Sequence, residues 1–152
     1  MPRRAAPQTP AANLLFPLFV TGQLAGALLS RAIAPSKLTS NEFAVLSIIA
    51  VFEPIAPTEL AQRAGMPATT LSDYLARLTQ RRLVKRSPNP DDGRSHLLAL
   101  TAEGRRRNSL AVEGLLDSNR LIATKLAVEP STVRAALVEL EQALRLAVSP
   151  KS

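Results

Sequence analysis

The sequence predicts a mainly α-helical fold with a single β-hairpin, and three observations support this class. Apolar residues make up 46% of the 152 residues and aromatic residues only 3%, so the core must consist mainly of Leu, Ala, Val and Ile, which suits packed helices. Signals that start and stop helices recur along the chain. Two short strand-like segments flank the turn-forming residues 89–93, which indicates one hairpin.

The N-terminal part of the chain is predicted to be a disordered tail followed by a helix. Residues 1–10 contain three prolines and few large apolar residues, which favours disorder. Residues 11–33 form an apolar helix that Pro17 kinks or starts, and residues 34–37 end it. The segment is similar to a signal peptide, but Pro17, Thr21, Gly22 and Gln23 interrupt it. We therefore expect no membrane contact, and expect the helix to pack against another subunit.

Three shorter helices are predicted next. Thr39 and Glu42 form a capping box, which starts a helix that stops before Pro54. A short helix follows, with Pro57 in its first turn and Gly65 just past its end. A third helix starts at residue 67 or 68 and continues to about residue 82.

The rest of the chain is predicted to be the hairpin and two long helices. The hairpin covers about residues 83–100. Thr101 caps a helix that runs to about Ala127, and Pro130 opens a last helix that ends near Val148. The sequence thus predicts six helices and a two-stranded wing.

The two helices before the hairpin have the spacing of a helix-turn-helix. Ala61 allows close approach of the helices, and Gly65 permits the left-handed backbone of a tight turn. The core-facing residues of the second helix unit are predicted to be Met66, Leu71, Leu75 and Leu78. The outward residues are Ala68, Thr69, Thr70, Ser72, Asp73 and Arg77. Small hydroxyl side chains near a helix N-terminus suit major-groove contacts, although an ordinary helical hairpin with a glycine C-cap shows the same spacing.

The positive charge is concentrated around the hairpin. The chain has a formal net charge of +7 and a pI of about 11.0. Residues 77–107 contain nine basic and only three acidic residues, which is nearly the whole excess. This pattern favours a polyanionic partner such as double-stranded DNA, although a basic run can also be a solvated surface.

The composition argues against an enzyme and against a metal or cofactor site. The chain has no cysteine and a single histidine, His96, so thiolate chemistry and a His-rich metal site are excluded. No nucleophile–base set or Gly-rich phosphate loop is present. His96 lies on the second predicted strand, where an exposed or phosphate-near position is favoured over a pH switch.

With these motifs in view, the chain resembles the MarR family of bacterial transcriptional regulators over nearly its whole length. The strongest match is Asp92-x-Arg94 followed by Leu100-Thr101-x-x-Gly104, which is similar to the wing signature of the family. Similar segments also occur at residues 59–65 and 78–84.

The resemblance implies roles for these segments. Arg94 would enter the minor groove from the wing tip, oriented by Asp92, and residues 68–82 would form the recognition helix. Residues 39–104 would be the DNA-binding lobe, and residues 11–38 and 105–148 would form the dimerisation region of a homodimer. The implied DNA-binding set is Ala68, Thr69, Thr70, Ser72, Asp73, Arg77, Arg81, Lys85, Arg86, Asp92 and Arg94.

The resemblance also implies a place for a small anionic aromatic effector, between the dimerisation helices and the lobe. The candidate residues are Phe16, Phe19, Phe43, Phe52 and Arg31. The chain departs from the family at two positions: Pro67 replaces the usual Ser or Thr at the start of the recognition helix, and Asp73 stands where a basic residue is common. It also lacks the cysteine that oxidant-sensing members use.

The sequence therefore predicts a cytoplasmic, homodimeric regulator that binds a pseudo-palindromic operator, usually as a repressor. Two alternatives stay open: a winged-helix module that binds protein, and a DNA-binding protein that ignores sequence. A protein-binding module would show little salt-dependent affinity for DNA. A non-specific DNA-binding protein would bind random and palindromic duplexes alike, whereas a specific regulator prefers its site.

Overall fold

The computed structural model describes residues 14–90 and 92–148, and for residues 93 and 94 it describes the backbone alone. The predicted tail at residues 1–10 lies outside these ranges. The described part contains six α-helices and a two-stranded antiparallel sheet, so the predicted mainly α fold with a wing is confirmed. The elements are α1 (Leu15–Ile33), the 3-10 turn η1 (Ala34–Ser36), α2 (Ser40–Phe52), α3 (Pro57–Ala64), α4 (Ala68–Gln80), β1 (Val84–Asn89), β2 (Asp92–Leu100), α5 (Ala102–Ala123) and α6 (Pro130–Val148).

The chain divides into two compact units, Met1–Leu115 and Leu116–Ser152. The first unit contains α1, the lobe and the part of α5 up to Leu115. Helix α1 is anchored in this unit at its C-terminal end, where Ile33 is fully buried. Close to this point, a methyl group on Gly114 of α5 would lie 2.0 Å from the carbonyl oxygen of Ala32, the residue before Ile33, so α1 and α5 approach closely there.

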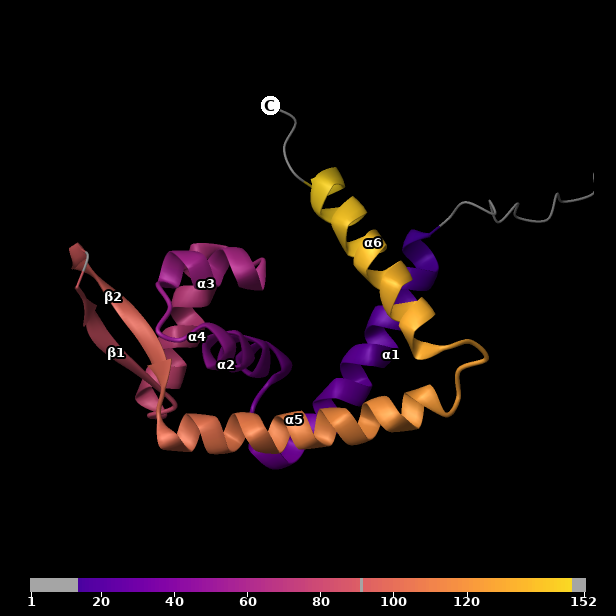
Figure 1. The fold of residues 1–152 in the computed structure, drawn as a ribbon, viewed down its shortest axis with the longest axis horizontal. Helices are drawn as coiled ribbons and strands as arrows, with labels where there is room; N and C mark the ends of the chain where they lie inside the picture. The colour runs from indigo at the N-terminus through magenta and orange to yellow at the C-terminus, as the bar shows by residue number, and fades with distance from the viewer. Residues whose placement is uncertain (1–13, 91, 149–152) are drawn as a thin grey trace, which may run out of the picture. The chain divides into compact units, whose positions relative to one another are not determined.

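The core of the first unit lies among α2, α3, α4 and the base of the hairpin, which are grouped together in Figure 1. Helix α4 contributes three buried leucines at helical spacing, Leu71, Leu75 and Leu78, as predicted. Each buried leucine stabilises the fold by about 1.5–3 kcal/mol. Met66, which was predicted to be a core residue, is half-buried and packs on the edge of this cluster. This packing fixes which face of α4 is left outside.

Helix α1 exposes large apolar side chains along its length, including Leu15, Phe19 and Leu24. Pro17 lies in its first turn, where the missing amide hydrogen would have no partner within the helix, so the helix begins close to the proline. By length and composition, residues Leu15–Ser36 could also cross a membrane, with a mean hydropathy of 1.3. A signal sequence and the core helix of a soluble protein pass the same test, so a single such helix is weak evidence for a membrane span.

The predicted capping box at the start of α2 is confirmed. The Glu42 amide donates to Oγ1 of Thr39 over 3.3 Å, and the Thr39 amide donates to Oε2 of Glu42 over 2.9 Å. Before it, η1 ends at Lys37, whose φ of 56° is left-handed. Thus the chain turns sharply between α1 and the lobe.

The helix-turn-helix is formed by α3 and α4. Gly65 ends α3 with a φ of 62°, as its place in the sequence predicted. Helix α4 ends at Gln80, two residues earlier than predicted, because Arg82 adopts a left-handed φ of 56°. The turn that follows leads directly into β1.

The hairpin is fixed at its base. Strands β1 and β2 pair from Val84–Leu100 to Pro88–His96, with an irregularity between Pro88 and Asn89. Ile55 forms an isolated β-bridge with β2 by exchanging two backbone hydrogen bonds with Leu98, of 3.1 and 2.9 Å. The base of the wing is therefore joined to the segment between α2 and α3.

The start of α5 is tied to the same base. The Gly104 amide donates to Oγ1 of Thr101 over 3.0 Å, and the Thr101 hydroxyl donates to the Arg82 carbonyl over 2.7 Å. A methyl group on Gly104 would lie 2.0 Å from the carbonyl oxygen of Leu83. The Leu-Thr-x-x-Gly motif thus has a packing cause. Helix α5 ends at Ala123 rather than near Ala127, because the chain tightens into a turn with a bond from the Lys125 amide to the Ile122 carbonyl.

Candidate nucleic-acid interface

The outward face of α4 carries every residue that the sequence assigned to it. These side chains are exposed: Ala68, Thr69, Thr70, Ser72, Asp73 and Arg77. Pro67 precedes the helix and supplies no side-chain cap, so the leading amides of α4 have no capping partner from it. Open amides and the positive end of the helix dipole favour a phosphate at this end.

Two further residues belong to this face, and the sequence analysis missed them. Ala76 and Gln80 are exposed, and they continue the row that starts with Thr69 and Asp73. Positions three, four and seven residues apart share one side of a helix. Helical spacing counted from Thr69 could therefore have found both.

The side chains of Tyr74 and Arg77 connect α4 to its surroundings. The amide group of Asn41 on α2 donates to the hydroxyl of Tyr74 over 2.7 Å. The Arg77 guanidinium lies 4.6 Å from the centre of the Tyr74 ring, a cation–π contact. Arg77 is thus held beside the exposed face while its charge stays near the surface.

Arg81 has a different environment from the other predicted DNA-binding residues. Its guanidinium pairs with the buried carboxylate of Glu42 over 2.9 Å and donates to the Lys37 carbonyl over 2.6 Å. Burial raises the pKa of Glu42, but the hydrogen bonds from the Thr39 amide and from Arg81 outweigh burial and hold that pKa below its usual value. Arg81 therefore joins the end of α4 to the turn between α1 and α2.

The charges of the basic segment separate into two groups. On α5, Arg105 pairs with Glu53, and both Arg106 and Arg107 pair with Glu103. The hydrogen bonds from Arg106 and Arg107 lower the pKa of Glu103 to about 2. Within the described residues, Arg82, Lys85 and Arg86 have no carboxylate partner. The unneutralised charge is thus concentrated where α4 meets the wing.

On the wing, Lys85 and Arg86 are exposed neighbours in β1 and point to opposite sides of the strand. Arg86 borders a cavity of about 160 Å³ that also contacts Ser72 and His96. His96 is half-buried, and its Nε2 atom has no hydrogen-bond partner within the part of the chain that is described. Its position is therefore less open than the sequence suggested.

The wing tip contains the remaining two predicted residues. Asp92 is exposed and begins β2, and the backbone of Arg94 lies in the same strand. The Arg94 side chain is not among the described atoms, so its orientation by Asp92 stays a prediction.

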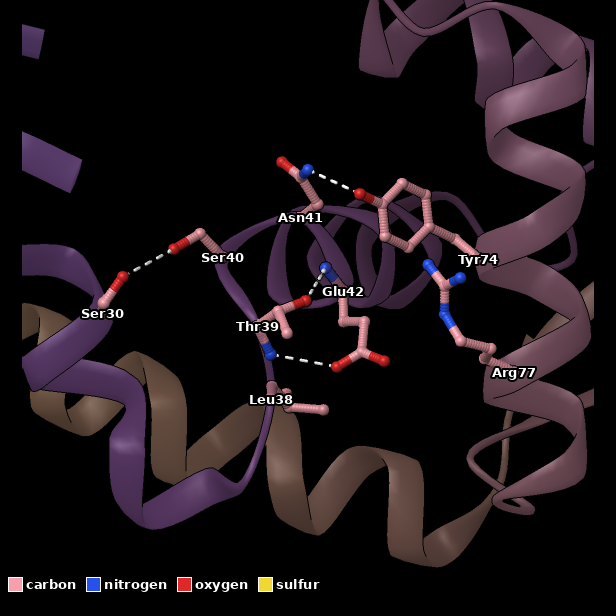
Figure 2. Close-up of a pocket in the computed structure, with 8 residues that line it drawn as sticks. All are labelled: Ser30, Leu38, Thr39, Ser40, Asn41, Glu42, Tyr74 and Arg77. Atoms are coloured by element: carbon pink, nitrogen blue, oxygen red, sulfur yellow. Dashed lines mark hydrogen bonds between the residues drawn. The ribbon is translucent and has the colours of Figure 1, made fainter. Parts of the chain in front are cut away.

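A second, larger cavity of about 730 Å³ opens beside α4 (Figure 2). Tyr74 and Arg77 approach it from α4, and the other lining residues come from the end of α1, the segment before α2 and the start of α2. Ser30 and Ser40 share a hydrogen bond of 3.3 Å at its edge. The full lining set is Ser30, Leu38, Thr39, Ser40, Asn41, Glu42, Tyr74 and Arg77.

The five predicted effector residues do not line this cavity, and they are spread over the first unit. Phe43 is buried in the core. Phe52 lies at the far end of α2, and the centre of its ring is 3.6 Å from the guanidinium carbon of Arg63. Phe16 and Phe19 are exposed near the start of α1, and Arg31 is exposed in its last turn. The polar lining beside Arg77 was missed because its residues are far apart in the sequence.

Comparison with known proteins places this arrangement in one family. The model of the MarR family matches residues 36–95, which contain α2, α3, α4 and most of the hairpin. The multiple antibiotic resistance protein MarR of Salmonella typhimurium is 31% identical over 87 residues, 57% of this chain. The transcriptional regulator MosR of M. tuberculosis, in complex with DNA, superposes with a TM-score of 0.75 at 26% identity and covers 88% of this chain and 97% of its own. The winged helix-turn-helix of this chain, at residues 36–95, therefore matches the MarR family.

The likeness to MarR-family structures extends beyond the lobe. The PcaV regulator of Streptomyces coelicolor, in complex with its natural ligand, is 25% identical with a TM-score of 0.75 and covers 91% of this chain and 96% of its own. At the level of sequence, the match spans about 60% of the length of the curated MarR relative. The winged helix-turn-helix is therefore the part of the chain that matches the MarR family most strongly.

Proposed function

We propose that this chain is a sequence-specific DNA-binding transcriptional regulator of the MarR family, acting as a repressor. The observation that carries the proposal is the exposed face of α4, which presents small and hydroxyl side chains next to the unneutralised cations Arg82, Lys85 and Arg86. Hydroxyl groups and the backbone amides can bind phosphates or base edges, while the cations neutralise phosphates. The DNA complex of the relative MosR supports the same partner.

The operator is proposed to be a pseudo-palindrome bound by a homodimer. Large apolar side chains on α1 are exposed within a single chain, and a second copy is the partner that would cover them: Leu15, Phe16, Phe19, Val20 and Leu24. Residues 11–38 and 105–148 form the dimerisation region in this proposal, and residues 39–104 form the lobe. A two-fold axis then places two copies of α4 about one helical turn of DNA apart. Such a regulator acts in the cytoplasm, where bacterial DNA lies.

The wing completes the contact with DNA in this proposal. Lys85, Arg86 and Asp92 lie on its two strands, and Arg94 is proposed to enter the minor groove from its tip. A narrow, A·T-rich groove has a strong negative potential and attracts an arginine. The wing therefore adds a preference for A·T pairs next to the bases that α4 contacts.

An effector that releases DNA is proposed to occupy the cavity of about 730 Å³ beside α4. Arg77 is the cation at its edge, so an anionic aromatic compound bound there competes with DNA for the same guanidinium. The PcaV complex with a natural ligand supports ligand binding in a related protein. Titration of the DNA complex with benzoate and salicylate tests this, and release of DNA is expected for wild type. The affinity of each compound for the free protein is then measured for wild type and Arg77→Gln. Equal affinities would contradict the site.

Selection from a random duplex library tests the whole proposal. Bound DNA is sequenced after several rounds, and the expected result is a pair of inverted half-sites separated by about 10 base pairs centre to centre. Enrichment of one unpaired motif would contradict the two-fold arrangement. Absence of any motif would contradict a sequence-specific regulator and favour non-specific DNA binding.

A further inference from the structure

An acidic side chain occupies the centre of the face that α4 presents to solvent. Counting along the helix, Thr69, Asp73, Ala76 and Gln80 recur at intervals of three and four residues and form one row. All four are exposed. Asp73 is the one acidic residue of α4, and it lies in the middle of this row. A carboxylate here repels the phosphates that the surrounding cations attract. At this position Asp73 therefore weakens DNA binding, unless a group of the DNA donates a hydrogen bond to it.

The carboxylate of Asp73 has no partner within the described residues, whereas the neighbouring acids do. Carboxylates of the same lobe pair with arginine: Glu42 with Arg81, Glu53 with Arg105, Glu59 with Arg63, and Glu103 with Arg106. Arg77, one helical turn after Asp73, is placed to form such a pair but stacks on the Tyr74 ring instead. The acceptor oxygens of Asp73 are therefore available to a ligand that approaches this face.

The chemistry of a carboxylate restricts which base it can bind. An ionised carboxylate only accepts hydrogen bonds. In the major groove, the amino group of cytosine is a donor without an acceptor on the same base, whereas the amino group of adenine lies beside its N7 acceptor. Guanine and thymine present acceptors, which repel the carboxylate. The small side chains of Thr69 and Ala76 on either side of Asp73 leave room for a base edge to approach.

We propose that Asp73 determines specificity by accepting a hydrogen bond from the N4 amino group of one cytosine in each half-site. This inference rests on the proposed DNA-binding function. Through the same charge, Asp73 lowers affinity for every duplex that lacks a cytosine at that position. Asp73 therefore raises the ratio of specific to non-specific affinity in two ways: it gains a hydrogen bond at the correct site and repels phosphates at all others.

The test compares wild type with Asp73→Asn and Asp73→Ala on a panel of duplexes. Starting from the selected operator, each base pair of the half-site is replaced in turn by the other three, and dissociation constants are measured by fluorescence anisotropy. The matched control is Glu113→Gln, which removes one exposed, unpaired carboxylate from α5 and changes the net charge equally.

One base-pair position is expected to respond to Asp73. Wild type prefers cytosine there by about tenfold, the preference of a good base contact. Asp73→Ala loses that preference and binds scrambled duplex more tightly than wild type. Asp73→Asn shifts the preference towards adenine, which matches the donor and acceptor of an amide. Glu113→Gln keeps the cytosine preference, because only its net charge has changed.

Two results overturn the inference. One is a wild-type protein that selects an operator while Asp73→Ala and Asp73→Asn keep its base preference at every position. The other is a position that responds to Asp73 but prefers a base other than cytosine. If wild type itself shows no preference among duplexes, the proposed function fails instead, so the two failures are distinguishable.

Discussion

Glu42 connects parts of the chain that are far apart in sequence, and its pair with Arg81 spans 39 residues. The carboxylate is almost fully buried, so removal of its partner leaves a charge without compensation. Arg81→Met is expected to lower the free energy of unfolding by about 3 kcal/mol. Urea unfolding at neutral pH measures this. The control is Arg63→Met, which breaks an exposed pair with Glu59 and is expected to cost less than about 1 kcal/mol.

The same pair gives a pH dependence. The pKa of Glu42 is lowered from 4.5 in the folded protein, so its contribution to stability is complete above that value and is lost as the pH falls through the folded-state pKa. The difference between wild type and Arg81→Met should therefore shrink in acid. An equal difference at pH 3 and pH 7, or equal effects of the Arg81 and Arg63 variants, would show that the Glu42 pair does not stabilise the fold.

The predicted role of Arg94 in the minor groove rests on the sequence alone, because the structure does not describe its side chain. Arg94→Ala is expected to weaken operator binding by about tenfold and to flatten the preference for A·T pairs next to each half-site. Anisotropy with operators that carry A·T or G·C flanks measures both effects. Unchanged affinity on both operators would remove Arg94 from the interface.

At the scale of elements, local signals in the sequence correctly predicted the helix caps and turns, because these depend on residues that are close together in the chain. The Thr39–Glu42 box, the turn at Gly65 and the cap at Thr101 each depend on residues within four positions of one another, and each is present in the structure. The pairing of Arg81 with Glu42 and the polar cavity beside Arg77 could not be predicted in this way. They depend on how helices pack, which a local pattern does not contain.

The junction of the wing with α5 depends on a glycine. In Gly104→Ala the added methyl group would meet the backbone of Leu83, so this variant is expected to lose about 1–3 kcal/mol of stability as the two elements move apart. Thermal and urea unfolding measure the loss. At Gly22 of α1 an added methyl group meets nothing within 4 Å beyond the adjacent backbone of its own helix, so Gly22→Ala is the control. Equal stability of Gly104→Ala and wild type would contradict the close approach.

At the scale of the whole molecule, the exposed apolar side chains of α1 carry the proposed homodimer. Phe19 and Leu24 are 63% and 68% exposed in a single chain, so replacing both with glutamate is not expected to disturb the core. The double variant should sediment as a monomer while its circular dichroism stays unchanged. Val51→Glu, at a 73% exposed position on α2, is the control and should stay dimeric. A dimeric double variant would place the interface elsewhere.

The central claim, that this protein binds a particular DNA sequence, is tested most directly by fluorescence anisotropy of the purified protein. The duplexes are the region upstream of its own gene and a scrambled duplex of the same composition, at several salt concentrations. We expect binding to the first to be at least about 10³-fold tighter, and affinity to fall steeply as salt rises. Equal affinity for both duplexes, or weak binding that does not change with salt, would contradict the claim.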